Sequence, residues 1–70
     1  MSDSIYKVIE LIGSSDKSWE DAAKKAVERA AKTLEDLRIA EVTNQDMKIE
    51  AGKVVAYRTK VKLSFRFREG

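Results

Sequence analysis

Near its end, between residues 54 and 68, the sequence alternates almost without interruption between apolar and mostly basic side chains. Successive side chains of a strand point to opposite faces of a sheet, so this pattern predicts one long strand with two unlike faces. The face expected to meet the protein core carries Val55, Tyr57, Thr59, Val61, Leu63, Phe65 and Phe67. The opposite face carries Arg58, Lys60, Lys62, Ser64, Arg66 and Arg68. The rest of the chain must therefore supply a cover for the first face.

A helix predicted from Ser18 to Leu37 can supply that cover. Ser18 can cap the first turn, and Asp21, three residues later, completes an approximate capping box. The apolar positions recur at helical spacing and are mostly alanine, so the helix can lie close to a sheet although it buries little area. This apolar stripe contains Trp19, Ala22, Ala23, Ala26, Val27, Ala30, Leu34 and Leu37. We interpret Trp19 as an anchor of the helix rather than as a ligand-stacking residue.

Two further strands are predicted on either side of this helix. The first runs from Ile5 to Ile12, has apolar residues on both faces, and is ended by the Gly13–Ser15 segment. The second runs over residues 38–49, and its buried side switches midway, which indicates a bulge or a strong twist near Asn44. A hairpin turn at residues 50–53, with Gly52 at positive φ, connects it to the last strand.

The order β-α-β-β predicts an α+β protein, with residues 1–70 forming a single domain. A helical crossover leaves the two strands that flank it parallel, whereas a hairpin makes its strands antiparallel. The last strand therefore fits between the other two. We expect a three-stranded antiparallel sheet wrapped around one helix.

Composition restricts the function. A lone core in a chain of 70 residues seldom provides more than about 3–5 kcal/mol, and the absence of Cys and His removes disulfides, the usual zinc sites and imidazole catalysis. We therefore expect stabilisation by self-association and no enzymatic activity. A net charge of +2 argues against a dedicated nucleic-acid partner, and no apolar run approaches the roughly 20 residues of a membrane span. The lack of cysteine is compatible with a cytoplasmic location.

The segments YKVIELIGSS, SWEDAAKKAVERAAKTL, AEV and AYRTKVKLSFRF, taken together, resemble the dodecin family over essentially the whole chain. The resemblance implies a βαββ subunit that assembles into a hollow homododecamer. It also implies a non-enzymatic role in binding and storing flavins such as FMN or riboflavin, with coenzyme A as a further cofactor in some members.

The resemblance also implies where a cofactor would bind. It aligns Ile39 with the family's flavin-stacking tryptophan, Ala40 with the aromatic residue that commonly follows, and Arg58 with a flavin-contacting glutamine. Arg38 and Gln45, polar residues of the predicted strand that contains Ile39 and Ala40, complete the candidate cofactor contacts. Stacking between aromatic rings is worth roughly 0.5–1.5 kcal/mol beyond burial, and Ile39 retains only the burial. This predicts a weakened hold on a flavin ring.

Two alternatives stay open. The segments IAEV, NQDM and YRTKVKLSF fit a branch that lacks the stacking tryptophan, one member of which is associated with calcium. Glu41, Asp46 and Glu50 are scattered, so we assign no metal ligand and expect any calcium site to need several subunits or backbone carbonyls. The other alternative is an assembly without a small ligand. The basic face could likewise bind phosphates or pair with acidic side chains of neighbouring strands or subunits. Arg58 itself could bind a ligand, or it could fill the pocket by pairing with an acidic group across a twofold axis between subunits.

Overall fold

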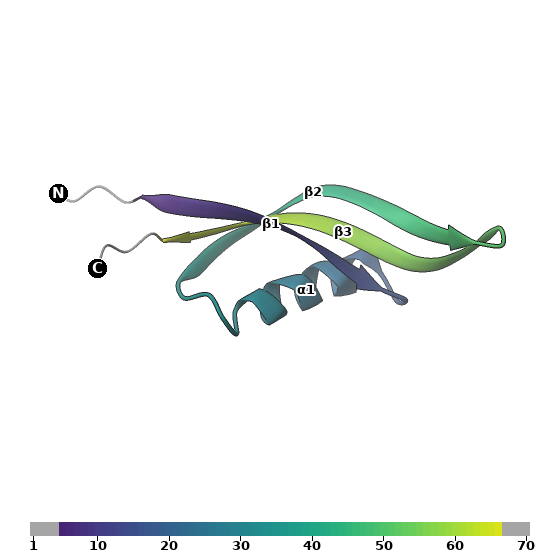
Figure 1. Cartoon of the computed structure of the whole chain (residues 1–70), viewed down its shortest axis with the longest axis horizontal. Helices are drawn as coiled ribbons and strands as arrows, with labels where there is room; N and C mark the ends of the chain where they lie inside the picture. The colour runs from purple at the N-terminus through teal and green to yellow at the C-terminus, as the bar shows by residue number, and fades with distance from the viewer. Residues whose placement is uncertain (1–4, 67–70) are drawn as a thin grey trace.

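The computed structural model describes residues 5–66, which form four elements in the predicted order (Figure 1). These are β1 (Tyr6–Ser15), α1 (Trp19–Ala30), β2 (Leu37–Glu50) and β3 (Lys53–Arg66). The sheet order is β1-β3-β2, and both strand pairs are antiparallel. The predicted α+β architecture, with the last strand at the centre of the sheet, is confirmed. Phe67 and Arg68, which the alternation assigned to this strand, lie outside the described residues.

The core lies between α1 and the middle of β3. Val61 and Leu63 are buried there against Ala26 and Ala30 of the helix, and Thr59 is buried beside them. The alternation of the sequence therefore identified the covered face correctly at Thr59, Val61 and Leu63, whereas Val55, which it assigned to the same face, is exposed. The small alanine side chains allow α1 to lie close to the sheet, as expected.

β1 continues through the Gly13–Ser15 segment, so the prediction that this segment ends the strand is wrong. A Cβ atom on Gly13 would lie 2.1 Å from the backbone oxygen of Ala22 and 3.1 Å from the Cβ of Ala26. Gly13 is thus needed for the close approach of helix and strand, and it does not mark a turn.

The start of α1 is held by two serine residues. Ser18 Oγ accepts a hydrogen bond from the Asp21 amide at 3.0 Å, which confirms the predicted N-cap. The Asp21 carboxylate accepts a hydrogen bond from Ser15 Oγ at 2.6 Å and forms an ion pair with Lys25 at 3.0 Å. These contacts tie the end of β1 to the first turn of the helix.

α1 ends at Ala30, seven residues before the predicted end at Leu37. The amides of Thr33 and Leu34 both donate to the Ala30 carbonyl, so the chain tightens into a turn, and Asp36 then adopts a φ of 59°. Leu34 packs against the core from this turn, and Leu37 begins β2 while also touching the core. The spacing of the two leucines reflects their contact with the core and not a continued helix.

β2 and β3 are joined by the predicted hairpin turn. Gly52 has a φ of 75°, as expected, and Ala51 also has a positive φ of 51°. Positive φ at both central residues is typical of a type I′ turn. The predicted bulge is confirmed by a register shift between Val42 and Asn44, and further shifts occur between Leu37 and Ile39 and between Lys48 and Ile49.

Replacing Ala51 should test the strain in this turn. Left-handed backbone costs an L-residue roughly 1–2 kcal/mol, whereas Asn adopts it readily and Asn-Gly is a preferred type I′ pair. We expect Ala51→Asn to raise the free energy of unfolding by about 0.5–1 kcal/mol, measured by urea denaturation at fixed protein concentration. Ala51→Val should lower it, because β-branched residues disfavour positive φ. Shifts of the same sign in both variants would contradict this account.

A single copy is elongated and leaves much apolar surface exposed. It measures 55 × 20 × 15 Å, and its radius of gyration is 14.6 Å, whereas a compact domain of this length has a value of roughly 11 Å. The end of the β2–β3 hairpin extends past β1 and α1 (Figure 1). Ten large apolar side chains of the described region are exposed: Ile5, Tyr6, Val8, Ile12, Ile39, Val42, Met47, Ile49, Val54 and Val55. Within residues 5–66, no helix is long and apolar enough to cross a membrane.

Candidate functional site

The sheet face opposite α1, here called the open face, carries the basic side chains of β3 between residues of the two edge strands. Where all three strands pair, the register gives this face four rows, each written in the order β1, β3, β2, and the Tyr6–Arg66 pair of β1 and β3 extends it. The rows are Ser14–Arg58–Asp46, Ile12–Lys60–Asn44, Glu10–Lys62–Glu41 and Val8–Ser64–Ile39. Carboxylates therefore flank the basic centre of the sheet.

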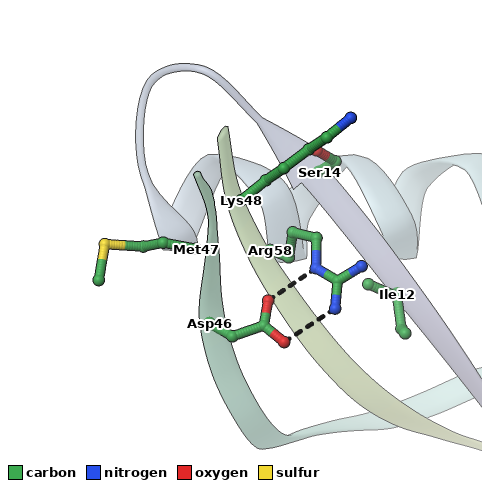
Figure 2. Close-up of a pocket in the computed structure, with 6 residues that line it drawn as sticks. All are labelled: Ile12, Ser14, Asp46, Met47, Lys48 and Arg58. Atoms are coloured by element: carbon green, nitrogen blue, oxygen red, sulfur yellow. Dashed lines mark hydrogen bonds and ion pairs between the residues drawn. The ribbon is translucent and has the colours of Figure 1, made fainter. Parts of the chain in front are cut away.

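Arg58 and Asp46 form a two-point ion pair on this face (Figure 2). The guanidinium donates from Nε to Oδ1 at 2.7 Å and from Nη2 to Oδ2 at 2.9 Å. The Arg58 hydrogen bond holds the pKa of Asp46 below its usual value, and the Asp46 carboxylate in turn raises the pKa of Arg58. Arg58 thus pairs with an acidic group, but the partner is Asp46 of the same chain and not a residue across a twofold axis.

This ion pair borders a hollow of about 580 Å³. Its lining residues come from all three strands (Figure 2) and are Ile12, Ser14, Asp46, Met47, Lys48 and Arg58. The volume falls within the range of small-molecule sites, roughly 300–1,000 Å³. It combines an apolar side with a hydroxyl group, two cations and one carboxylate.

Trp19 holds the helix start against the strands beside this hollow. Its Nε1 donates to the Asp46 carbonyl at 3.0 Å, and its own carbonyl accepts from Thr59 Oγ1 at 2.9 Å. Its ring lies edge-on to that of Tyr57, with ring centroids 5.1 Å apart. The anchoring interpretation is confirmed within one chain, and the contact to Asp46 places Trp19 directly behind the Arg58 ion pair.

The cofactor contacts expected from the sequence are not brought together in one chain. Arg38, Ile39 and Ala40 line a separate hollow of about 160 Å³ at the start of β2, where the Ile39 side chain is 63% exposed. Ile39 is in register with Ser64, six residues from Arg58 along β3, a separation of roughly 20 Å. Gln45 is in register with Thr59. A site that used all five residues would need more than one copy of the chain.

Sequence reasoning missed the contributions of Ile12, Ser14, Met47 and Lys48 to the larger hollow. It named Asp46 only as a scattered carboxylate or a pairing partner. Each of these residues becomes visible once the strand register is known, because the register places them around Arg58.

The described part of one chain does not offer a calcium-binding site. Residues 5–66 contain no group of three or more acidic, histidine or cysteine side chains that could hold a metal ion. Asp46 is engaged by Arg58, and Glu50 lies 3.4 Å from Lys48. Calcium takes six to eight oxygen ligands, so a site would have to draw carboxylates or carbonyls from several copies.

Two carboxylates should make the fold sensitive to acid. The pKa of Asp21 is lowered, chiefly by the Ser15 hydrogen bond and then by Lys25, and Arg58 lowers that of Asp46. A lowered folded-state pKa stabilises the protein above the unfolded value of about 3.9, and this contribution is lost as pH falls through the folded value. We expect the urea concentration at the unfolding midpoint to decrease as the pH is lowered below about 4. This decrease should be smaller in an Asp21→Asn/Asp46→Asn double variant. Equal acid sensitivity in both proteins would assign the effect to other groups.

Comparison with known proteins gives a consistent result. The family model described as Dodecin matches residues 5–68. The calcium dodecin of Mycobacterium tuberculosis is 46% identical over 65 residues, covering 93% of this chain and 92% of the relative. Its crystal structure, described as that of a calcium-chelating antigen with a novel calcium-binding site, superposes with a TM-score of 0.83 at 48% identity over 93% of each chain. The dodecin structure from Streptomyces coelicolor superposes with a TM-score of 0.92 at 38% identity over the full length of both chains.

Proposed function

Because the chain belongs to the dodecin family, we propose that it forms a non-enzymatic homo-oligomeric shell that binds calcium between its subunits. The main observation in support of an oligomeric shell is that a single copy is elongated and exposes ten large apolar side chains in its described part. Monomers rarely expose such extensive apolar surface, and burying it between copies would stabilise each of them. By family resemblance, the expected assembly is a dodecamer.

Calcium is favoured over other ligands by two observations. A relative 46% identical to this chain is a calcium dodecin. On the open face, Glu10 and Glu41 flank Lys62 in register, and neither carboxylate forms an ion pair within the described residues. Carboxylates from adjoining copies could supply the oxygen ligands that one copy lacks.

The test combines native mass spectrometry with calorimetry on chelator-treated protein. We expect an oligomer of defined subunit number and saturable calcium binding. A Glu10→Gln/Glu41→Gln variant should bind at least about tenfold more weakly, because fewer charged ligands lower calcium affinity. A Glu20→Gln/Glu28→Gln variant makes the same change in net charge on α1 and should bind as the unaltered protein does. A monomer, or no saturable binding at millimolar calcium, would overturn the proposal.

A cofactor store for flavin or coenzyme A is the second candidate. It is supported by the family resemblance and by the basic side chains of the open face, Arg58, Lys60, Lys62 and Arg66. The residues present do not fit a flavin ring sandwiched between aromatic side chains, because Ile39 supplies no ring and Arg58 is already paired.

Ile39→Trp should strengthen flavin binding. One added stacking contact, at roughly 0.5–1.5 kcal/mol, corresponds to an increase in affinity of about two- to tenfold. Quenching of riboflavin fluorescence measures this change, with Ile39→Leu as the aliphatic control. If Ile39→Trp binds riboflavin no better than Ile39→Leu, the site at the start of β2 does not take a flavin ring.

A further inference from the structure

We propose that Asp46 is a specificity-determining residue: its carboxylate occupies Arg58 as a built-in anion and excludes ligands that carry a phosphate or carboxylate from the hollow. The inference rests on the proposed ligand-binding function and names the class of ligand that this hollow rejects. It depends on the geometry of the ion pair, on what holds Asp46 in place, and on the charges that surround it.

The Asp46 carboxylate contacts Arg58 as an anionic ligand would. A guanidinium recognises planar carboxylates and phosphates through two parallel N–H donors, and Nε and Nη2 of Arg58 both point at Asp46 (Figure 2). Distances of 2.7 and 2.9 Å are those of short, charge-assisted hydrogen bonds. An incoming anion that needs this edge of Arg58 must first displace Asp46.

The backbone keeps Asp46 in position to compete. Asp46 and Arg58 are directly opposed on adjacent strands, and the Asp46 carbonyl is also held by Trp19 Nε1 at 3.0 Å. Even flexibly tethered groups reach effective concentrations on the order of millimolar, and a pair fixed by a sheet is better preorganised. A free anion at micromolar concentration would therefore be outcompeted.

The surroundings would attract an anion if Asp46 were neutral. Lys48 lines the same hollow, and Lys60 lies close enough to contribute to the lowered pKa of Asp46. Lys48 also lies 3.4 Å from Glu50, in an exposed pair that a ligand could exchange easily. Removing the Asp46 charge would leave Arg58 and Lys48 lining the hollow, with Ser14 on its β1 side and Lys60 nearby on β3.

Asp46→Asn tests the inference, with inorganic pyrophosphate as the probe in calorimetry on the assembled protein. We expect the unaltered protein to show no saturable binding of pyrophosphate. Asp46→Asn should bind pyrophosphate at least about tenfold more tightly than the unaltered protein, because the Arg58 N–H donors no longer face a charged partner. The Asp46→Asn/Arg58→Gln variant should lose this gain. Glu28→Gln is the matched control, since it removes one negative charge from an exposed position on α1, away from Arg58.

The outcomes separate this inference from the proposed function. Comparable pyrophosphate binding by the unaltered protein, an equal gain in Glu28→Gln, or a gain that survives loss of Arg58 would each overturn it. Asp46→Thr, with a neutral side chain suited to a strand, provides the same test should Asp46→Asn fail to assemble. Native mass spectrometry and calcium titration of the same samples test the shell and its ion independently.

Discussion

Gly13→Ala should unfold the protein or lower its free energy of unfolding by about 3 kcal/mol or more, the upper end of the usual cost of overpacking. The added methyl group would lie 2.1 Å from the Ala22 oxygen, and the obstacle is backbone that cannot rotate away. α1 would have to move off the sheet and lose its contacts with Val61 and Leu63. Urea denaturation and circular dichroism at fixed protein concentration measure the loss.

Gly52→Ala is the matched control for Gly13→Ala. A Cβ on Gly52 meets no atom within 4 Å, but the residue has a φ of 75°. Its cost should be limited to the conformational penalty of roughly 1–2 kcal/mol. Should Gly13→Ala be as stable as Gly52→Ala, α1 does not lie against β1 as closely as described.

Leu63→Ala should lower the free energy of unfolding by about 2–5 kcal/mol through the cavity it creates. Leu63 is 1% exposed and is among the largest fully buried side chains of the described region. For a domain of this size, the change corresponds to a fall in melting temperature of about 10 °C or more, measured by thermal denaturation at fixed concentration. Leu63→Met keeps the volume and should cost less than about 1.5 kcal/mol. Equal losses in the two variants would mean that packing volume is not what Leu63 contributes.

Much of the fold could be predicted because one pattern dominates the sequence. The alternation along β3 identifies the buried residues Thr59, Val61 and Leu63, and the alanine stripe identifies the helix that covers them. Chain order and the parallel or antiparallel directions that the connections impose then leave β3 in the centre of the sheet. The end of the helix was harder to predict, because Leu34 and Leu37 continue the helical spacing. In the structure, Leu34 contacts the core from a turn and Leu37 contacts it from the start of β2. The positive φ of Asp36 has no glycine to signal it.

The candidate site could be predicted only in part, because it depends on strand register. In a regular hairpin closed by Glu50 and Lys53, Asp46 would lie opposite Tyr57. The register shift between Lys48 and Ile49 places it opposite Arg58 instead. A slip of one residue changes which side chains meet across a strand pair, and periodicity alone does not locate it. The ion pair that borders the hollow therefore follows from a bulge. The sequence predicted that basic side chains of this face could pair with acidic side chains of neighbouring strands or subunits, but it did not place Asp46 opposite Arg58.

The central place of β3 has a consequence for biosynthesis. β1 and β2 do not pair with each other, and every ladder in the described sheet includes β3, which is the last strand to leave the ribosome. When synthesis has reached only the hairpin turn, β1 and β2 have no strand with which to pair. Folding on the ribosome should thus be delayed until β3 emerges, which leaves the nascent chain dependent on protection from aggregation until that moment.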